Sequence, residues 1–200
     1  RPIADHGITL VPGDCVYVDL NADGEINSND ATRDIGYTDM PEYTAGLNTG
    51  FSWKNFDFSM QWTGAWNADR MLDEFRRPLG DTNEKGLLLY QYDTTWRSSA
   101  DTFTAKFPRT SSLHASNNYA GSDLYLVNAS YLRLKSIEIG YNFNFPFMKK
   151  LKMDNCRLYV NGYNLVTITG FKWGDPESRQ SSRPNYPLTR VFNIGLKLGF

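Results

Sequence analysis

A two-residue alternation of apolar and polar side chains between positions 43 and 66 is the feature that most restricts the fold of this chain. In Tyr43–Trp53, and again in Phe56–Trp66, mostly apolar residues occupy every second position, with polar or small residues between them. Successive side chains of a β-strand point to opposite faces, so the pattern predicts two strands with one apolar and one polar face. Lys54–Asn55, between them, predicts a two-residue hairpin turn. Strands of about ten residues can cross a bilayer when tilted, although the hairpin of a soluble β-sandwich also alternates.

Three later segments show the same alternation. In residues 131–143 the alternation breaks near Lys135, which indicates a β-bulge or the edge of a membrane band. In residues 156–169 it breaks around Gly162, whereas residues 190–200 alternate without a break. We expect one set of side chains of this last strand to face lipid, namely Phe192, Ile194, Leu196, Leu198 and Phe200. Its polar side chains, Asn193 and Lys197, are expected to face the lumen.

The connections between these strands alternate in length. A two-residue turn is followed by a connection of about 60 residues, then by a short link and by a connection of about 20 residues. Transmembrane β-barrels have this asymmetry, with short periplasmic turns and long extracellular loops. Within the longest connection, residues 68–77 and 85–96 are compatible with short helices, the first of which would end at Pro78. About five strands are too few to close a barrel, so the pattern predicts one part of a larger barrel.

Composition and motifs restrict the possible functions. The net charge of −1, from 21 basic and 22 acidic residues, gives no reason to expect a nucleic-acid partner. No apolar run reaches the 18 residues of a transmembrane helix, and the opening residues RPIADHG are not those of a signal peptide, so we expect the chain to begin within a longer protein. Cys15 and Cys156 form no metal or redox motif. His6 and His114 are expected to be isolated in loops, so no catalytic constellation is predicted and the chain is not expected to be an enzyme.

The segment DLNADGEINSND has the spacing of a calcium-binding loop. Asp19, Asn21 and Asp23 stand at positions 1, 3 and 5 of a twelve-residue frame, and Gly24 at position 6 allows the sharp turn. The remaining predicted ligands are the carbonyl of Glu25 and the carboxylate of Asp30. Calcium binds six to eight hard oxygens, which this spacing would bring together, whereas the alternative is an Asn- and Asp-rich turn without metal. Glycine and proline follow the loop instead of a helical pattern, so a paired EF-hand is not expected.

Six blocks of the sequence, in the same order, resemble the C-terminal part of a known family. The blocks are GDCVYVDLNADGEINSNDATRDIG, PEYTAGLNTGFSWKNFDFSMQWTGAW, WRSSADTFTAKFPR, SYLRLKSIEIGY, LYVNGYNLVTITGFKWGDPE and YPLTRVFNIGLKLGF. They are similar to segments of the SusC/RagA-type TonB-dependent outer-membrane transporters. The resemblance covers nearly the whole chain.

The resemblance implies an all-β fold: the C-terminal antiparallel strands of a transmembrane β-barrel of about 22 strands with long extracellular loops. Residues 1–42 would then be an extracellular loop with the calcium-binding-like motif, and residues 43–200 the C-terminal portion of the barrel. The family imports oligosaccharides, or in some cases peptides, through the Gram-negative outer membrane, together with a SusD-like surface lipoprotein and with energy relayed by TonB. In that setting calcium would stiffen an extracellular loop, and Phe200 would serve as a signal for barrel assembly.

Four aromatic residues are candidate substrate contacts because sugars stack on aromatic faces. They are Trp66, Tyr119, Trp173 and Tyr186. For Trp66, a place in the aromatic girdle at the membrane interface is an equal alternative. The alternative function for the whole chain is a secreted, calcium-stabilised β-sandwich that binds carbohydrate.

Overall fold

The computed structural model describes residues 3–73, 75–76, 88–146, 152–178 and 188–200. The chain forms two compact units. One unit consists of Arg1–Gly36 with Arg70–Val127, and the other of Tyr37–Asp69 with Asn128–Phe200. The N-terminal segment therefore folds together with the long connection that follows the first hairpin. A division of the sequence at residue 42 does not reveal this association.

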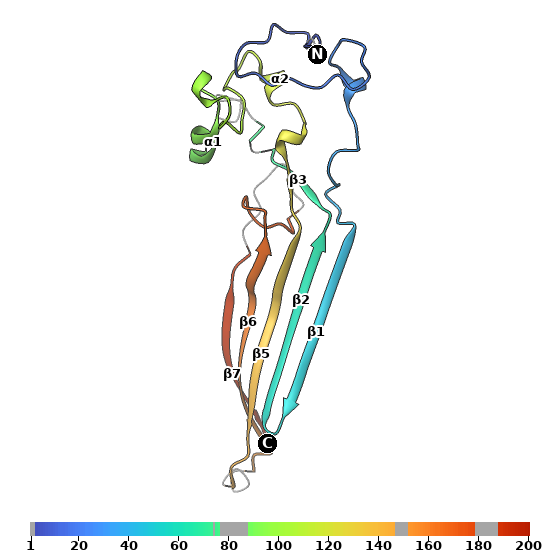
Figure 1. The fold of residues 1–200 in the computed structure, drawn as a ribbon. Helices are drawn as coiled ribbons and strands as arrows, with labels where there is room; N and C mark the ends of the chain where they lie inside the picture. Colours follow the sequence, from blue (N-terminus) through green and yellow to red (C-terminus); the bar gives the residue numbers. More distant parts are fainter. Residues whose placement is uncertain (1–2, 74, 77–87, 147–151, 179–187) are drawn as a thin grey trace. The chain divides into compact units, whose positions relative to one another are not determined.

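The second unit is built on one antiparallel sheet whose strand order is β1-β2-β5-β6-β7 (Figure 1). The strands are β1 (Tyr43–Trp53), β2 (Phe56–Trp66), β5 (Tyr131–Phe143), β6 (Asn155–Thr169) and β7 (Val191–Gly199). All five predicted strands are confirmed, and so is the two-residue turn, because Trp53 pairs with Phe56. Lys54 has a φ of 54°, the left-handed conformation that such a turn requires.

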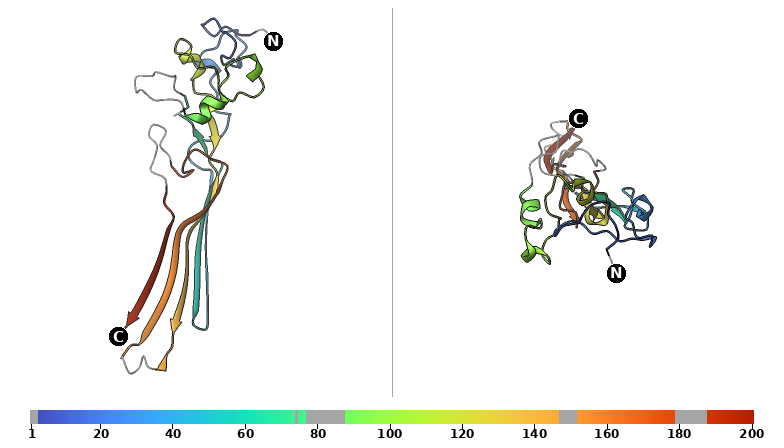
Figure 2. Two further views of the ribbon diagram at one scale, coloured as in Figure 1. Left: turned by 90° about the vertical axis from the view of Figure 1, so that its left-hand side faces the viewer. Right: turned by 90° about the horizontal axis from the view of Figure 1, so that it is seen from above.

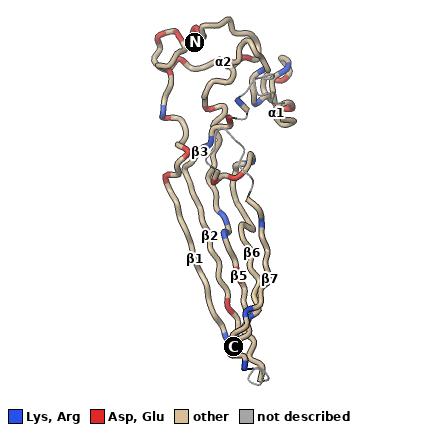
Figure 3. Tube along the Cα trace, turned by 180° about the vertical axis from the view of Figure 1, so that it is seen from behind, with Lys and Arg blue, Asp and Glu red and all other residues tan. Residues whose placement is uncertain are grey.

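The pairing register gives the sheet one apolar and one polar face. One row across all five strands consists of Phe51, Phe58, Ile139, Val160 and Ile194. The adjacent row on the opposite face consists of Gly50, Ser59, Glu138, Asn161 and Asn193. Directly paired residues point to the same face, so the alternation in each strand adds up to two continuous surfaces of opposite character. Charged residues are sparse along the strands (Figure 3).

A bulge keeps these faces continuous where the sequence pattern breaks. Gln61 pairs with Ser136 and the next residue, Trp62, pairs with Leu134, so that Lys135 has no partner on β2. The β5–β6 pairing shifts at the same level, and Asn164 there has a φ of 54°. One extra residue reverses the phase of the alternation. The predicted break near Lys135 is therefore a bulge.

The apolar face of the sheet is uncovered. Phe192 and Ile194 are 69% and 78% exposed, and the five strands of this sheet form one twisted layer (Figure 2). A β-sandwich would pack a second sheet on this face, and no such sheet occurs among the described residues. None of the helices in the described ranges combines the length and the apolar character needed to cross a membrane.

The first unit consists largely of loops and short helices, with a small aromatic core. Its elements are η1 (Ser28–Asp30), α1 (Leu89–Thr94), η2 (Ser99–Asp101), α2 (Ala115–Asn118) and η3 (Asp123–Tyr125). Phe107 stacks between Phe75 and Tyr125, at centroid distances of 5.4 and 6.0 Å. The second predicted helix is confirmed in part, because α1 lies within residues 85–96, of which residues 85–87 are outside the described ranges.

The helix predicted over residues 68–77 is wrong. The chain instead forms β3 (Asp69–Met71), which pairs with β4 (Leu126–Asn128) in a two-stranded sheet. The backbone turns at Asn67, whose φ is 55°. Pairing with a strand nearly 60 residues away overrides the local helical propensity. Pro78, the predicted end of the helix, lies outside the described residues.

Candidate functional site

The loop Asp19–Asp30 folds its polar side chains back onto its own backbone. The carboxylate of Asp19 accepts a hydrogen bond from the Gly24 N–H at 2.8 Å, and Gly24 has a φ of 90°. Asn21 Oδ1 accepts from the Asp23 N–H at 3.0 Å, and Asp23 Oδ1 accepts from the Glu25 N–H at 2.9 Å. The first half of the twelve-residue frame is therefore a tight turn in which three side-chain oxygens point inward.

Asp30 closes the loop. Its carboxylate accepts hydrogen bonds from the N–H groups of Leu20 and Asn27, both at 2.9 Å, and it forms a capping box at the start of η1. The N–H groups of Asn27 and Leu20 hold the pKa of Asp30 below its ordinary value. The last position of the frame thus joins the two ends of the loop by hydrogen bonds.

One oxygen atom of the loop is suited to binding a cation. Asp19 Oδ1 is buried and has no hydrogen-bond partner. A buried carboxylate oxygen can only accept, so its negative charge favours a positive ligand. Among the described residues, no three Asp, Glu, His or Cys side chains converge on one point. A metal here would therefore also need the amide oxygen of Asn21 and the backbone carbonyl of Glu25, both of which are hard oxygen donors suited to calcium.

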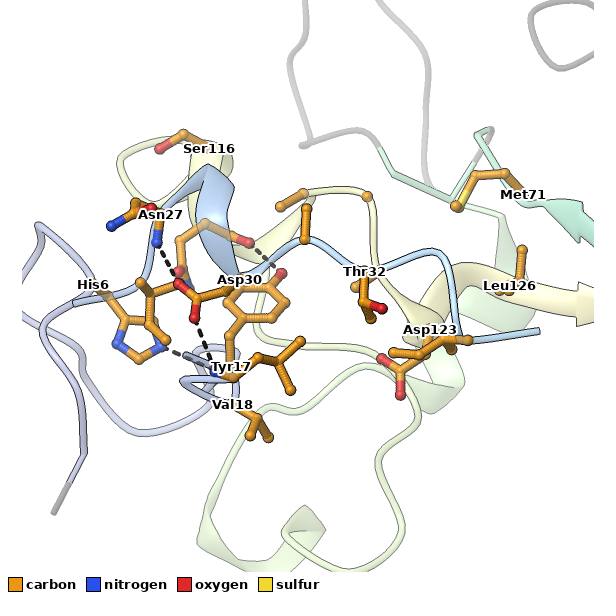
Figure 4. Close-up of a pocket in the computed structure, with 18 of the residues that line it drawn as sticks. His6, Tyr17, Val18, Asn27, Asp30, Thr32, Met71, Ser116, Asp123 and Leu126 are labelled. Atoms are coloured by element: carbon orange, nitrogen blue, oxygen red, sulfur yellow. Dashed lines mark hydrogen bonds between the residues drawn. The ribbon is translucent and has the colours of Figure 1, made fainter. Parts of the chain in front are cut away.

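A cavity of about 610 Å³ lies beside this loop within the first unit (Figure 4). Its walls include Leu20, Ile26 and Asp30 of the loop, together with His6 and Tyr17. His6 Nε2 accepts a hydrogen bond from the Tyr17 N–H at 2.9 Å, and His6 Nδ1 lies 2.8 Å from the carbonyl of Ala4. Since only a neutral ring accepts at Nε2, these contacts assign the proton to Nδ1. His6 therefore has a structural role in holding the N-terminal segment.

A buried ion cluster joins the N-terminal segment to residues 109–118. The fully buried carboxylate of Asp14 lies 2.6 Å from Arg109 Nε and 2.7 Å from His114 Nδ1, and it also accepts from Asn118 at 2.9 Å. Burial raises the pKa of Asp14, but hydrogen bonds from the Val11 N–H and from these three side chains outweigh it and hold the pKa well below its ordinary value. The expectation that the two histidines are isolated is wrong, because both are hydrogen-bonded across the unit.

A second cluster lies on the polar face of the sheet. Arg157 of β6 bonds to both oxygens of Asp57 on β2 and lies 2.7 Å from Glu138 on β5. To reach Asp57 from β6, the guanidinium crosses β5 above Gly140, where a Cβ atom would collide with it. Sequence reasoning missed this cluster, because the three residues belong to different strands and only the pairing register brings them together.

The four candidate substrate contacts lie in different surroundings. Trp66 pairs with Tyr43 on the apolar face, which favours the alternative of an aromatic girdle. Tyr119 is only 8% exposed, so its ring is covered by the first unit. Trp173 is half-buried in the segment after β6, and Tyr186 lies outside the described residues.

The remaining residues that the sequence analysis singled out are the two cysteines and Phe200. Both cysteines are free. Burial raises the pKa of the Cys15 thiol to about 11, and Cys156 pairs with Leu198 on the apolar face. Phe200 is 81% exposed.

Comparisons with known proteins decide the family. No family model matches the chain. The chain is 30% identical over 206 residues to TonB-dependent receptor P3 of Formosa agariphila, a match that covers 94% of the chain and 19% of the receptor. It is 28% identical over 191 residues to TonB-dependent receptor SusC of Bacteroides thetaiotaomicron, covering 94% of the chain and 18% of SusC. The chain belongs to the SusC/RagA-type TonB-dependent receptors.

Solved structures of this family have the same fold. The RagAB peptide importer in its open-open state matches 88% of the chain with a TM-score of 0.66 at 22% identity, and the match covers 19% of the importer chain. Its closed-closed state matches 95% of the chain with a TM-score of 0.65 at 24% identity, covering 21% of the importer chain. The five-stranded sheet is thus a section of a SusC/RagA-type barrel. The chain spans about a fifth of the length of the curated relatives that it matches.

Proposed function

We propose that this chain forms part of the wall of a TonB-dependent transporter that imports nutrients across the Gram-negative outer membrane. The observation that carries this proposal is the two-faced sheet, in which the apolar row through Phe58 and Ile139 and the polar row through Ser59 and Glu138 each run across all five strands. An uncovered apolar face on strands of nine to fifteen residues fits the lipid environment of a barrel wall. The polar face then lines the lumen through which substrate passes. We assign the chain no catalytic role.

We further propose that the substrate is an oligosaccharide or a peptide, captured together with a SusD-like surface lipoprotein. Two features support this proposal: the similarity to SusC, and the fold shared with the RagAB peptide importer. Trp173 is the described aromatic candidate that is neither on the apolar face nor fully buried. Energy coupling to TonB would use parts of the receptor outside this chain.

Calcium is proposed as a structural ion in the loop Asp19–Asp30. Asp19, Asn21, Asp23, the Glu25 carbonyl and Asp30 would hold it, and the unpartnered Asp19 Oδ1 supports the assignment. A bound ion would neutralise the carboxylates of a loop that has little apolar core of its own. Phe200, at the end of the apolar row of β7, is proposed to contribute to recognition by the assembly machinery.

Uptake by intact cells tests the transport function. A strain lacking the full-length receptor is compared with the complemented strain on labelled oligosaccharide pools and on labelled peptide pools. We expect one of the pools to be depleted only by the complemented strain, and depletion to stop when the proton gradient that drives TonB is collapsed. Equal depletion of both pools by both strains would overturn the proposed function.

A further inference from the structure

The segment after β6 folds back over the polar face of the sheet instead of extending away from it. Thr169 Oγ1 donates a hydrogen bond to the Ser130 carbonyl at 2.8 Å and accepts one from the Phe171 N–H at 3.1 Å. Asp175 and Glu177, further along, then reach the side chain of Arg133 on β5. Arg133 pairs with Thr63 and Thr167, and all three lie on the polar face.

Arg133 lies at the centre of a buried ion-pair site. Its side chain is 3% exposed, and its Nη2 and Nη1 atoms lie 2.6 Å from Asp175 Oδ1 and 2.7 Å from Glu177 Oε2. Its Nε donates to Thr167 Oγ1 at 3.1 Å, and the guanidinium lies over the Tyr131 ring at 5.2 Å. A planar guanidinium can hold two carboxylates and stack on a ring at the same time, which an ammonium group cannot do.

The carboxylates in turn fix the backbone of the segment. Asp175 Oδ1 also accepts a hydrogen bond from the Glu177 N–H at 2.9 Å, and the Asp175 carbonyl accepts from the Ser178 N–H at 3.0 Å. Pro176, between the two carboxylates, is buried. Lys135, in the bulge, lies 3.6 Å from Glu177, so two cations face two anions and the cluster has no net charge. The shape of residues 171–178 therefore depends on contacts that converge on one arginine.

We propose that Arg133 is a positioning residue that holds residues 171–178 against the polar face of the sheet. The segment then forms part of the inner wall of the barrel and presents Trp173 to the substrate path, an inference that rests on the proposed transport function. A half-buried indole two residues before the carboxylates of a neutralised ion cluster suits a substrate with a flat apolar face and surrounding polar groups. Sugar rings and the proline or aromatic side chains of peptides have this chemistry.

Hydrogen exchange and uptake kinetics on the full-length receptor test this role. Arg133→Gln removes the charge, and we expect amide exchange in residues 171–178 to become at least about tenfold faster than in the wild type. The apparent KM of uptake should rise while the amount of receptor in the outer membrane stays unchanged. Arg133→Lys should rescue only in part, because an ammonium group does not hold two carboxylates side by side.

Two further variants keep the test decisive. Arg157→Gln, which breaks an arginine–carboxylate cluster elsewhere on the same face, should leave exchange in residues 171–178 at the wild-type rate. Asp175→Asn with Glu177→Gln breaks the Arg133 contacts from the loop side and should reproduce the effect even if Arg133→Gln fails to assemble.

Unchanged exchange in both the Arg133 variant and the loop variant would overturn the positioning role. Faster exchange with an unchanged KM would overturn the place of the segment in the substrate path. A wild-type receptor that imports nothing would overturn the transport function itself, while the exchange rates would still decide whether Arg133 holds the segment.

Discussion

Asp14 is the residue on which the packing of the first unit most depends. Its fully buried carboxylate is the shared partner of Arg109 and His114. Asp14→Asn keeps the size of the side chain but leaves both partners without their anion. Breaking a buried ion pair costs about 3–5 kcal/mol, and we expect the lower end because Arg109 is partly exposed. Hydrogen exchange in the full-length receptor should show faster opening of residues 11–17 and 109–118. Asp34→Asn, at an exposed aspartate, is the matched control.

The lowered pKa of Asp14 gives this prediction a pH dependence. A carboxyl group whose pKa is lower in the folded than in the unfolded state adds stability above its unfolded pKa. That stability is lost as the pH falls through the folded pKa, which for Asp14 lies well below the ordinary value. The wild-type segment should therefore loosen progressively with acidification below about pH 4. The Asn variant should lack this component, and an identical acid response in both proteins would contradict the assignment.

At the scale of elements, the two faces of β7 give a matched pair of substitutions. Ile194 belongs to the apolar row and the neighbouring Asn193 to the polar row. A lysine on the lipid face near the bilayer midplane costs about 2–4 kcal/mol, whereas a lumen-facing lysine remains hydrated. Ile194→Lys should therefore lower the urea midpoint of the full-length receptor in lipid vesicles much more than Asn193→Lys. Equal shifts, or a larger shift for Asn193→Lys, would reverse the assignment of the faces.

The strands were predictable from the sequence because their signal is local. The alternation along Tyr43–Trp66 reflects a sheet with one apolar and one polar face. Even the bulge at Lys135 appears in the sequence, as a change in the phase of the alternation. The helix predicted over residues 68–77 failed because β3 is defined by its partner β4 and not by its own residues. Asp14 and Arg133 were missed for the same reason, since their partners lie about 40 to 100 positions away. Nothing in a local pattern distinguishes such residues from solvated charges.

At the scale of the whole molecule, the sheet is incomplete without the rest of the receptor. In the described strand order, β1 and β7 each pair on one side only. Unpaired backbone N–H and C=O groups in hydrocarbon cost several kcal/mol each, so the open edges must pair with strands from outside this chain. Barrel stability is therefore spread over strand pairs, whereas the first unit depends on loops, ion pairs and a small aromatic core. The two should respond independently to substitutions in the loops.

The calcium proposal provides a test of this independence. Asp19→Ala with Asp23→Ala removes two carboxylates of the loop, including the oxygen that has no hydrogen-bond partner. We expect calcium to slow amide exchange in residues 16–30 of the wild-type receptor, relative to a chelator, and to have no effect in the double variant. The urea midpoint of the barrel should stay the same, while binding of the partner lipoprotein or uptake falls. Asp34→Ala controls for the loss of an acidic side chain outside the twelve-residue frame. Two outcomes would contradict the calcium site: amide exchange in the wild type that does not change with calcium, or exchange in the double variant that still does. Either would show that the loop is an Asn- and Asp-rich turn held only by its own hydrogen bonds.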